Sequence, residues 1–285
     1  MTQGMVCHQT FRDEDGKWLF PTEVAKKQGG WIKTTDGKSV TAGRVEKMSK
    51  SKRNVVDPET IVENYGADTA RLFMLSDSPP ERDMEWTEAG VEGASRFLKR
   101  VYRLAKDSEL APFGTPVLPD SEGSALALIK ITHKSIISLS KDIENFRFNR
   151  AVAQLHILAN AIGVVKSTDK GAAAAKRFGV ETLAQLLSPL SPHIAEEIWE
   201  TLGHETMLAN TAWPKADECL AADDEIEVGI QVNGKLRDTI MLSRDCENAD
   251  AEARALESKT ILRYLNGNTP KKIIVVKNRV INVVI

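Results

Sequence analysis

Apolar residues recur every three or four positions through a long central stretch of this 285-residue chain, and this period constrains the fold most strongly. The stretch begins near Thr87 and ends near Leu202. Its period predicts a run of four or five helices with short connectors, which bury their apolar faces against one another in a bundle. After a first helix from Thr87, we expect helices at about 121–145, 149–166, 169–187 and 191–202, the last capped by Ser191.

The period changes to two before the bundle, which indicates strands. Short extended segments lie around polar turns, at about 5–11, 17–20, 31–34 and 39–41. Two helices are expected between these strands and the bundle, the first capped by Asp57 and the second by Asp68.

The period also changes to two after the bundle, where residues 225–232 alternate polar and apolar side chains. Asn233-Gly234 follows, which is the strongest short hairpin signal, and 235–242 forms the return strand. A helix at 249–265 and two more strands complete a small ββαββ unit. The sequence therefore predicts an α+β multidomain fold, with parts at 1–86, 87–212 and 225–285.

The composition is that of an ordinary globular protein, with 42% apolar and 27% charged residues. A formal net charge of −2 does not exclude a nucleic-acid partner, because a basic face matters more than a basic sum. No apolar run is long enough to cross a bilayer. Cys7, Cys219 and Cys246 are too scattered for a disulfide framework or a zinc site. We therefore expect a cytoplasmic protein with no membrane partner and no metal site.

Residues 44–54 concentrate positive charge, since five of their eleven side chains are cationic and one is anionic. The cations are Arg44, Lys47, Lys50, Lys52 and Arg53. A flexible loop of this kind suits a polyanion, because lysine carries a point charge on a long stem. From charge alone, a solvated basic loop remains an alternative. Ser49 and Ser51 are small and can donate hydrogen bonds, and Met48 is expected to anchor the loop.

The order Lys47-Met48-Ser49-Lys50-Ser51 resembles the signature (KMSKS) loop of class I aminoacyl-tRNA synthetases. Other stretches resemble the leucyl-tRNA synthetase family in particular. They are Tyr65-Gly66-Ala67-Asp68-Thr69-Ala70-Arg71-Leu72-Phe73 and Gln231-Val232-Asn233-Gly234-Lys235-Leu236-Arg237. The segment 187–199, with Ser191-Pro192-His193-Ile194-Ala195-Glu196-Glu197, is similar to a helix shared by the leucyl, isoleucyl, valyl and methionyl enzymes. The resemblance covers essentially the whole chain.

The resemblance implies that the parent enzyme joins leucine to tRNA(Leu) through a leucyl-adenylate, converting ATP to AMP and pyrophosphate. By this resemblance Lys47, Met48, Ser49, Lys50 and Ser51 form the ATP and pyrophosphate loop. Lys50 would contact ATP and stabilise the departing pyrophosphate, Lys47 would assist, and Mg²⁺ would accompany ATP as its counter-ion. Arg53 departs mildly from the family pattern, in which asparagine often stands there.

The family's other ATP motif, His-x-Gly-His, occurs nowhere in the sequence. The editing domain and the leucine pocket have no counterpart either. We therefore expect a C-terminal fragment that forms no aminoacyl-adenylate by itself. Two alternatives remain at this point, namely a stand-alone tRNA-binding module without chemistry and a fragment of an isoleucyl or valyl enzyme.

Basic residues also gather in the predicted C-terminal unit. They include Lys235, Arg237, Lys271 and Lys272, with Lys277 and Arg279 nearby. Charge alone fits a solvated face as well as an RNA-facing one. The resemblance implies that the first four contact tRNA, at its elbow and long variable arm, and that the helical bundle lies along the tRNA.

Overall fold

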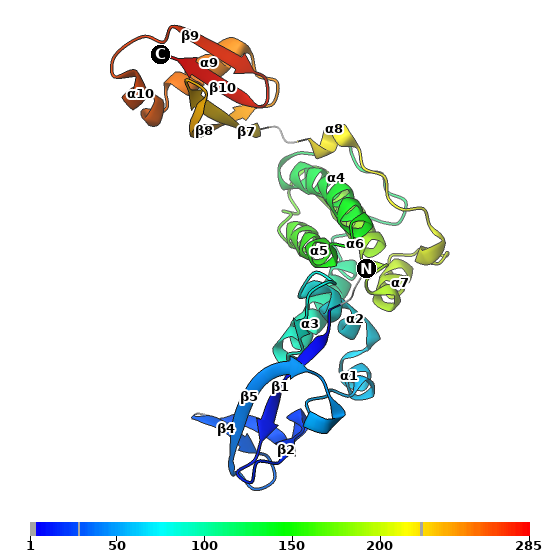
Figure 1. The fold of residues 1–285 in the computed structure, drawn as a ribbon. Helices are drawn as coiled ribbons and strands as arrows, with labels where there is room; N and C mark the ends of the chain where they lie inside the picture. The colour runs from blue at the N-terminus through cyan, green and yellow to red at the C-terminus, as the bar shows by residue number, and fades with distance from the viewer. Residues whose placement is uncertain (1–3, 28, 223–224) are drawn as a thin grey trace. The chain divides into compact units, whose positions relative to one another are not determined.

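The computed structural model describes residues 4–27, 29–222 and 225–285, and Figure 1 shows the course of the chain through them. The chain divides into two units, Met1–Ala221 and Ala222–Ile285, which are described separately below. The first contains strands followed by helices, and the second is a small sheet with two helices.

An antiparallel sheet opens the first unit, in the strand order β2-β1-β5-β4-β3. The strands are β1 (Val6–Arg12), β2 (Trp18–Leu19), β3 (Val24–Lys27), β4 (Gly30–Lys33) and β5 (Ser39–Lys47), and the short β6 (Met84–Glu85) lies parallel to β1. Phe11, Leu19, Val24 and Val40 form a core of their own. Strand β5 continues to Lys47, so the first part of the basic stretch, which we expected to be a loop, is strand.

Two helices connect this sheet to the bundle, α1 (Pro58–Tyr65) and α2 (Ala67–Ser76), and α3 (Glu88–Ala105) is the first helix of the bundle. The carboxylate of Asp57 accepts a hydrogen bond from the Glu59 N–H, which confirms the predicted cap of α1. The prediction that Asp68 caps α2 is wrong, because Gly66 is the N-cap and Asp68 lies within the first turn.

The bundle continues with α4 (Gly123–Glu144), α5 (Phe148–Gly163), α6 (Ala172–Leu187) and α7 (Pro192–Thr201). These are the helices expected from the apolar period, and Leu128, Leu139, Leu155 and Leu183 are among the side chains fully buried between them. The side chain of Ser191 makes no cap hydrogen bond to α7, contrary to the prediction. Asp68 does so instead, because its Oδ2 accepts from the Ile194 N–H at 2.7 Å.

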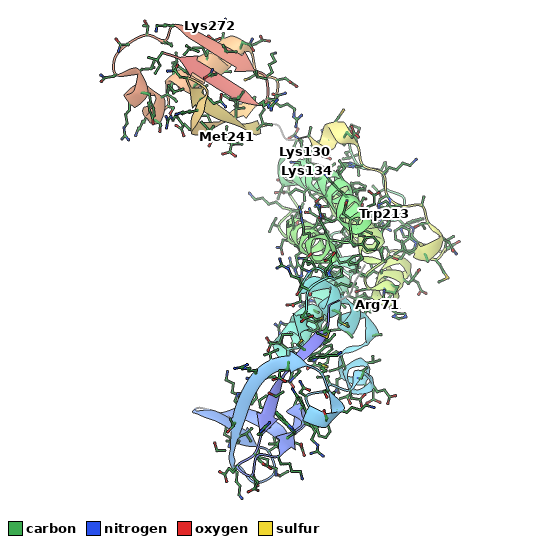
Figure 2. The ribbon with its side chains drawn as sticks, in the orientation of Figure 1. Arg71, Lys130, Lys134, Trp213, Met241 and Lys272 are labelled. Atoms are coloured by element: carbon green, nitrogen blue, oxygen red, sulfur yellow. The ribbon has the colours of Figure 1, made fainter. Side chains whose placement is uncertain are left out.

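The segment after α7 runs alongside α4 before the second unit begins. It contains a 3₁₀ turn at Leu208–Asn210 and the short helix α8 (Glu218–Ala221). The indole N–H of Trp213 donates to Ser140 Oγ at 2.7 Å, and the Asp217 N–H donates to His133 Nδ1 at 3.1 Å. Figure 2 labels Trp213 beside α4. Two side chains of α4 therefore hold this segment in place.

The second unit is a four-stranded sheet in the order β8-β7-β10-β9, with two helices. Its elements are β7 (Glu225–Val232), β8 (Lys235–Ser243), α9 (Asn248–Leu256), α10 (Lys259–Leu265), β9 (Lys272–Val276) and β10 (Val280–Val284). Asn233 and Gly234 both have positive φ, 48° and 81°, as a tight hairpin turn requires. The single helix predicted here is two helices, since the Ser258 hydroxyl caps α10 by accepting from the Ile261 N–H. The topology is thus ββααββ and not ββαββ.

Candidate functional site

The signature loop leaves the sheet at the end of β5, and its first residues stay attached to β1. Lys47 is the Cα partner of Cys7 in the antiparallel ladder. The Met48 N–H then donates to the Val6 carbonyl oxygen at 3.1 Å. The Met48 side chain packs, partly buried, against the cluster of Phe73, Met84, Trp86 and Val91. It therefore occupies the anchoring place expected from the sequence.

A single 3₁₀ turn, Lys50–Lys52, forms the centre of the loop, with Ser49 as its N-cap. The hydroxyl oxygens of Ser49 and Ser51 lie 2.8 Å apart and share a hydrogen bond. Arg53 ends the turn in the left-handed conformation, with φ at 55°. Asparagine adopts this conformation more readily than most residues, which gives a physical reason for asparagine at this position.

Arg44 lies within β5, and the other four cations of residues 44–54 fall into two groups. Lys52 forms an ion pair with Glu46, and Arg53 lies 3.5 Å from a Glu23 oxygen and 4.5 Å from the Phe20 ring centre. The hydrogen bond from Lys52, helped by nearby positive charge, lowers the pKa of the Glu46 carboxyl. Within the described residues, no carboxylate forms an ion pair with Lys47 or Lys50. These two ammonium groups are therefore the ones available to an anion.

A cavity of about 660 Å³ adjoins the loop and has Lys50 in its wall. This volume is in the range typical of small-molecule sites. The rest of the wall comes from β1, the turn after β2, the segment before α1, α1 itself and the start of α3, and it includes His8, Phe20, Thr22, Val56, Tyr65 and Trp86. The cavity thus offers mostly apolar surface beside the Lys50 ammonium group, and its wall also includes the carboxylates of Asp57 and Glu88.

A second group of contacts joins α2 to the corner between α6 and α7. Besides accepting from Ile194, Asp68 lies 3.1 Å from His193 Nδ1 through its other oxygen. Arg71, labelled in Figure 2, donates from Nε to the Leu190 carbonyl and from Nη2 to the Pro189 carbonyl, both at 3.2 Å. The two stretches 65–73 and 187–199 are therefore two sides of one contact.

In the second unit, the sheet brings Lys235, Lys271 and Lys272 to one end. Val232 is the partner of Lys235 in one ladder and of Val283 in the next, and Val284 is the partner of Lys272. The Lys271 ammonium lies 3.4 Å from the Ile285 carbonyl oxygen. Arg237 instead lies 4.8 Å from the centre of the Tyr264 ring.

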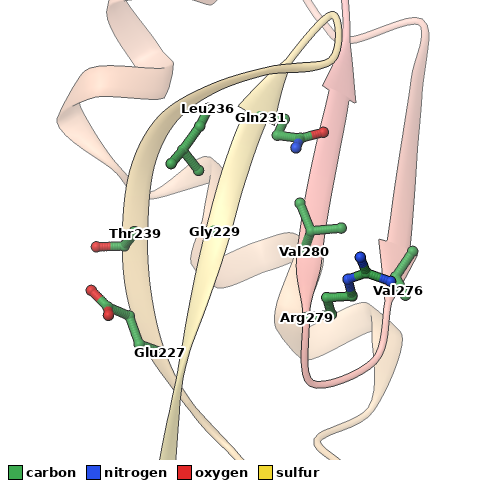
Figure 3. A pocket seen from close by; sticks show the side chains of 8 residues that line it. All are labelled: Glu227, Gly229, Gln231, Leu236, Thr239, Val276, Arg279 and Val280. Atoms are coloured by element: carbon green, nitrogen blue, oxygen red, sulfur yellow. The ribbon is translucent and has the colours of Figure 1, made fainter. Parts of the chain in front are cut away.

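Lys277 and Arg279 lie at the opposite end of this sheet, around the β9–β10 turn. Arg279 borders an open trough of about 460 Å³ on the sheet, drawn in Figure 3. The side chains of Leu236, Val276 and Val280 line the trough. Gly229 lies among them on β7, the strand between β8 and β10. The six basic residues singled out in the sequence of this unit therefore do not form one patch.

Family models match two separate parts of the chain. Residues 37–87 match the class I tRNA synthetases of the I, L, M and V types, and residues 126–253 match the anticodon-binding domain of tRNA ligases. The leucine–tRNA ligase of Rhodospirillum rubrum is 50% identical over the whole chain, and that of Paramagnetospirillum magneticum is 48% identical. The chain belongs to the leucyl branch of the class I tRNA synthetases.

This member of the leucyl branch spans about a third of the length of those relatives. The crystal structure of a ternary LeuRS–tRNA–LeuAMS complex from Agrobacterium radiobacter K84 is similar, with a TM-score of 0.73 and 26% identity. The similarity covers 99% of this chain and 33% of that one. These matches confirm a class I synthetase-like α+β fold and fit the leucyl hypothesis. They do not fit the isoleucyl or valyl alternative, nor a stand-alone module.

One residue at the base of the loop was not singled out in the sequence. Asn54 is fully buried, and its side chain makes hydrogen bonds to four backbone groups around the loop. A polar residue between the basic run and Val55-Val56 was the available signal.

Within the described residues, no group of three or more His, Cys, Asp or Glu side chains could hold a metal ion. In the same part of the chain, every helix is too short or too polar to span a bilayer.

Proposed function

We propose that this chain is the C-terminal portion of an enzyme that ligates leucine to tRNA(Leu) through leucyl-adenylate. ATP is consumed and AMP and pyrophosphate are released. The observation that carries the proposal is the pair Lys47 and Lys50, which lie on the signature loop and have no carboxylate in an ion pair with them among residues 4–27, 29–222 and 225–285. Lys50 also lies in the wall of a cavity. The leucyl relatives support the choice of amino acid.

The two lysines act on the charge that develops when ATP is split between its α and β phosphates. Cations placed where that charge develops lower the barrier, and such contacts are among the strongest contributions to catalysis. Lys50 stabilises the departing pyrophosphate and Lys47 assists. Ser49 and Ser51 offer hydroxyl donors nearby, and Mg²⁺ arrives with ATP as its counter-ion. The free ammonium groups fit a polyphosphate, whereas a fully neutralised loop would not.

The three parts of the chain then have different roles. Residues 1–86 are the end of the catalytic domain, with the signature loop and a stem-contact region. Residues 87–212 are an anticodon-binding-type bundle along the tRNA, and 225–285 is a tRNA-contacting domain. The matched families support the first two roles. The cationic end of the second unit, formed by Lys235, Lys271 and Lys272 with Arg237 nearby, supports the third.

The test is Lys50→Ala in the complete enzyme that carries this chain. We expect leucine-dependent pyrophosphate exchange to lose about 10²-fold in kcat, the usual cost of one lost transition-state contact, with little change in the KM for ATP. Lys52→Ala is the matched control, because the Lys52 ammonium already pairs with Glu46. Equal losses of kcat in Lys50→Ala and Lys52→Ala would assign the effect to the overall positive charge of the loop and not to Lys50 itself. A change in KM alone would argue against a transition-state role.

A further inference from the structure

Asn54 lies at the point where the signature loop meets the sheet, and it has no solvent exposure. Its Nδ2 is 3.1 Å from the His8 carbonyl oxygen, 3.2 Å from that of Glu46 and 3.3 Å from that of Lys47. Its Oδ1 accepts from the Ser49 N–H at 2.9 Å. One side chain therefore connects β1, the end of β5 and the start of the turn.

The environment of Asn54 selects a primary amide of this length. Three carbonyl oxygens surround one end of the side chain and one N–H faces the other, so the site needs two N–H donors and one acceptor. Aspartate would place a second acceptor against three carbonyl oxygens, and serine would have one donor only. Because buried backbone groups without partners are costly, loss of this amide leaves the loop's own backbone unsatisfied.

The four contacts bracket the two signature lysines. Two of the bonded carbonyls belong to Glu46 and Lys47, and the bonded N–H belongs to Ser49, which precedes Lys50. The four hydrogen bonds of the Asn54 side chain thereby fix the direction in which Lys47 leaves β5. They also fix the start of the turn that carries Lys50. A cation that is held in place beforehand loses less conformational entropy when the phosphates bind, and it stabilises the charge that develops in the transition state without having to reorient.

We propose that Asn54 is a positioning residue that holds Lys47 and Lys50 in place for the phosphates of ATP. It touches no substrate and acts through the backbone of the loop. The inference rests on the proposed phosphate role of the two lysines. It adds that the loop is held at its base by a buried amide, and is not an unrestrained flexible segment as its composition suggested.

The first measurement is hydrogen exchange of the Ser49 amide in this chain, comparing Asn54→Ala with Thr10→Val. Thr10 is the matched control because its buried hydroxyl on β1 donates to the Arg44 carbonyl. Arg44 lies on β5, the strand that leads into the loop, but before the loop begins. We expect Asn54→Ala to speed Ser49 exchange by about tenfold, as expected for one lost buried hydrogen bond, and Thr10→Val to leave it unchanged. Equal acceleration in both variants, or none in Asn54→Ala, would overturn the positioning role.

The second measurement is binding of inorganic pyrophosphate to the same variants, followed by ³¹P NMR. We expect Asn54→Ala to weaken binding by about three- to tenfold, and Thr10→Val to have no effect. Lys50→Ala separates the two proposals. If it leaves the affinity unchanged, the phosphate role of the loop fails, whatever Asn54 does. If Lys50→Ala weakens binding and Asn54→Ala does not, the role of Asn54 fails and the phosphate role stands.

Discussion

Replacing Asp68 by alanine should destabilise the first unit, because one carboxylate satisfies the start of a helix 126 residues away in the sequence. Its side chain is 9% exposed, accepts from the Ile194 N–H at 2.7 Å and lies 3.1 Å from His193 Nδ1. Loss of a helix cap costs about 1–2 kcal/mol, and a buried N–H left unpaired costs about 1–3 kcal/mol. The two estimates describe the same N–H, so we expect a loss of about 2 kcal/mol.

For a unit of this size, about 2 kcal/mol lowers the Tm by about 4–8 °C. Tryptophan fluorescence is the suitable assay, since all five tryptophans lie before residue 214 and report only on the first unit. Asp57→Ala is the control, because Asp57 is an exposed local cap and should cost less than about 1 kcal/mol. Asp68→Asn keeps one acceptor and should fall between the two. If Asp68→Ala lowers the Tm no more than Asp57→Ala, the long-range cap is not an important source of stability.

Two further predictions concern acid stability and RNA binding. Hydrogen bonds from Ser124, first from its hydroxyl and then from its N–H, lower the pKa of Asp169 below its ordinary value of 3.8. The stabilisation from these hydrogen bonds is complete above the ordinary pKa and is lost as the pH falls through the lowered pKa of the folded state. Asp169→Asn should therefore flatten the decrease of Tm below pH 4. If Tm decreases below pH 4 as much in Asp169→Asn as in the unchanged protein, these hydrogen bonds are not a cause of the acid sensitivity. Replacing Lys271 and Lys272 by glutamine should reduce the salt dependence of tRNA(Leu) binding by up to about 0.9 in log–log slope per lost phosphate contact. Lys277→Gln, at the other end of the sheet, should have less effect, and equal slopes in all variants would place the first two lysines in solvent.

Local signals in the sequence were sufficient for most elements and for several of their ends, although β3, β6 and α8 were not expected and α9 and α10 were expected as one helix. Asn233-Gly234 predicted a tight hairpin, and both residues have the positive φ that such a turn needs. Asp57 beside Pro58 predicted the start of α1. In both cases the deciding interactions join residues within two or three positions, so the sequence pattern contains them.

Caps supplied from a distance could not be predicted in this way. Asp169 was expected to start a helix, yet it lies before α6 and accepts from the Ser124 N–H at 2.7 Å, in the first turn of α4. Asp68 likewise serves α7 and not its own helix. A carboxylate at a helix start is equally favourable from either source, so the sequence pattern alone cannot separate them.

The candidate site shows the same limit. The order Lys47-Met48-Ser49-Lys50-Ser51 predicted the loop, but charge could not separate its cations. Their separation depends on Glu46, which β5 places beside Lys52, and on Glu23, which follows β2 and lies near Arg53. The folding of the sheet brings both carboxylates next to the loop, so only the folded chain shows which lysines pair with a carboxylate and which do not.

The contact between α2 and the α6–α7 corner explains why the strand-rich start and the bundle belong to one unit. Asp68 and Arg71 are three residues apart and therefore share one face of α2. From that face Arg71 satisfies the carbonyls of Pro189 and Leu190, and Asp68 satisfies the N–H of Ile194 at the start of α7. Leu72, the residue after Arg71, is buried in the core of the bundle. The proposed functional boundary at residue 86 therefore does not coincide with a break in packing, and a change at this corner reaches α2 by direct contact.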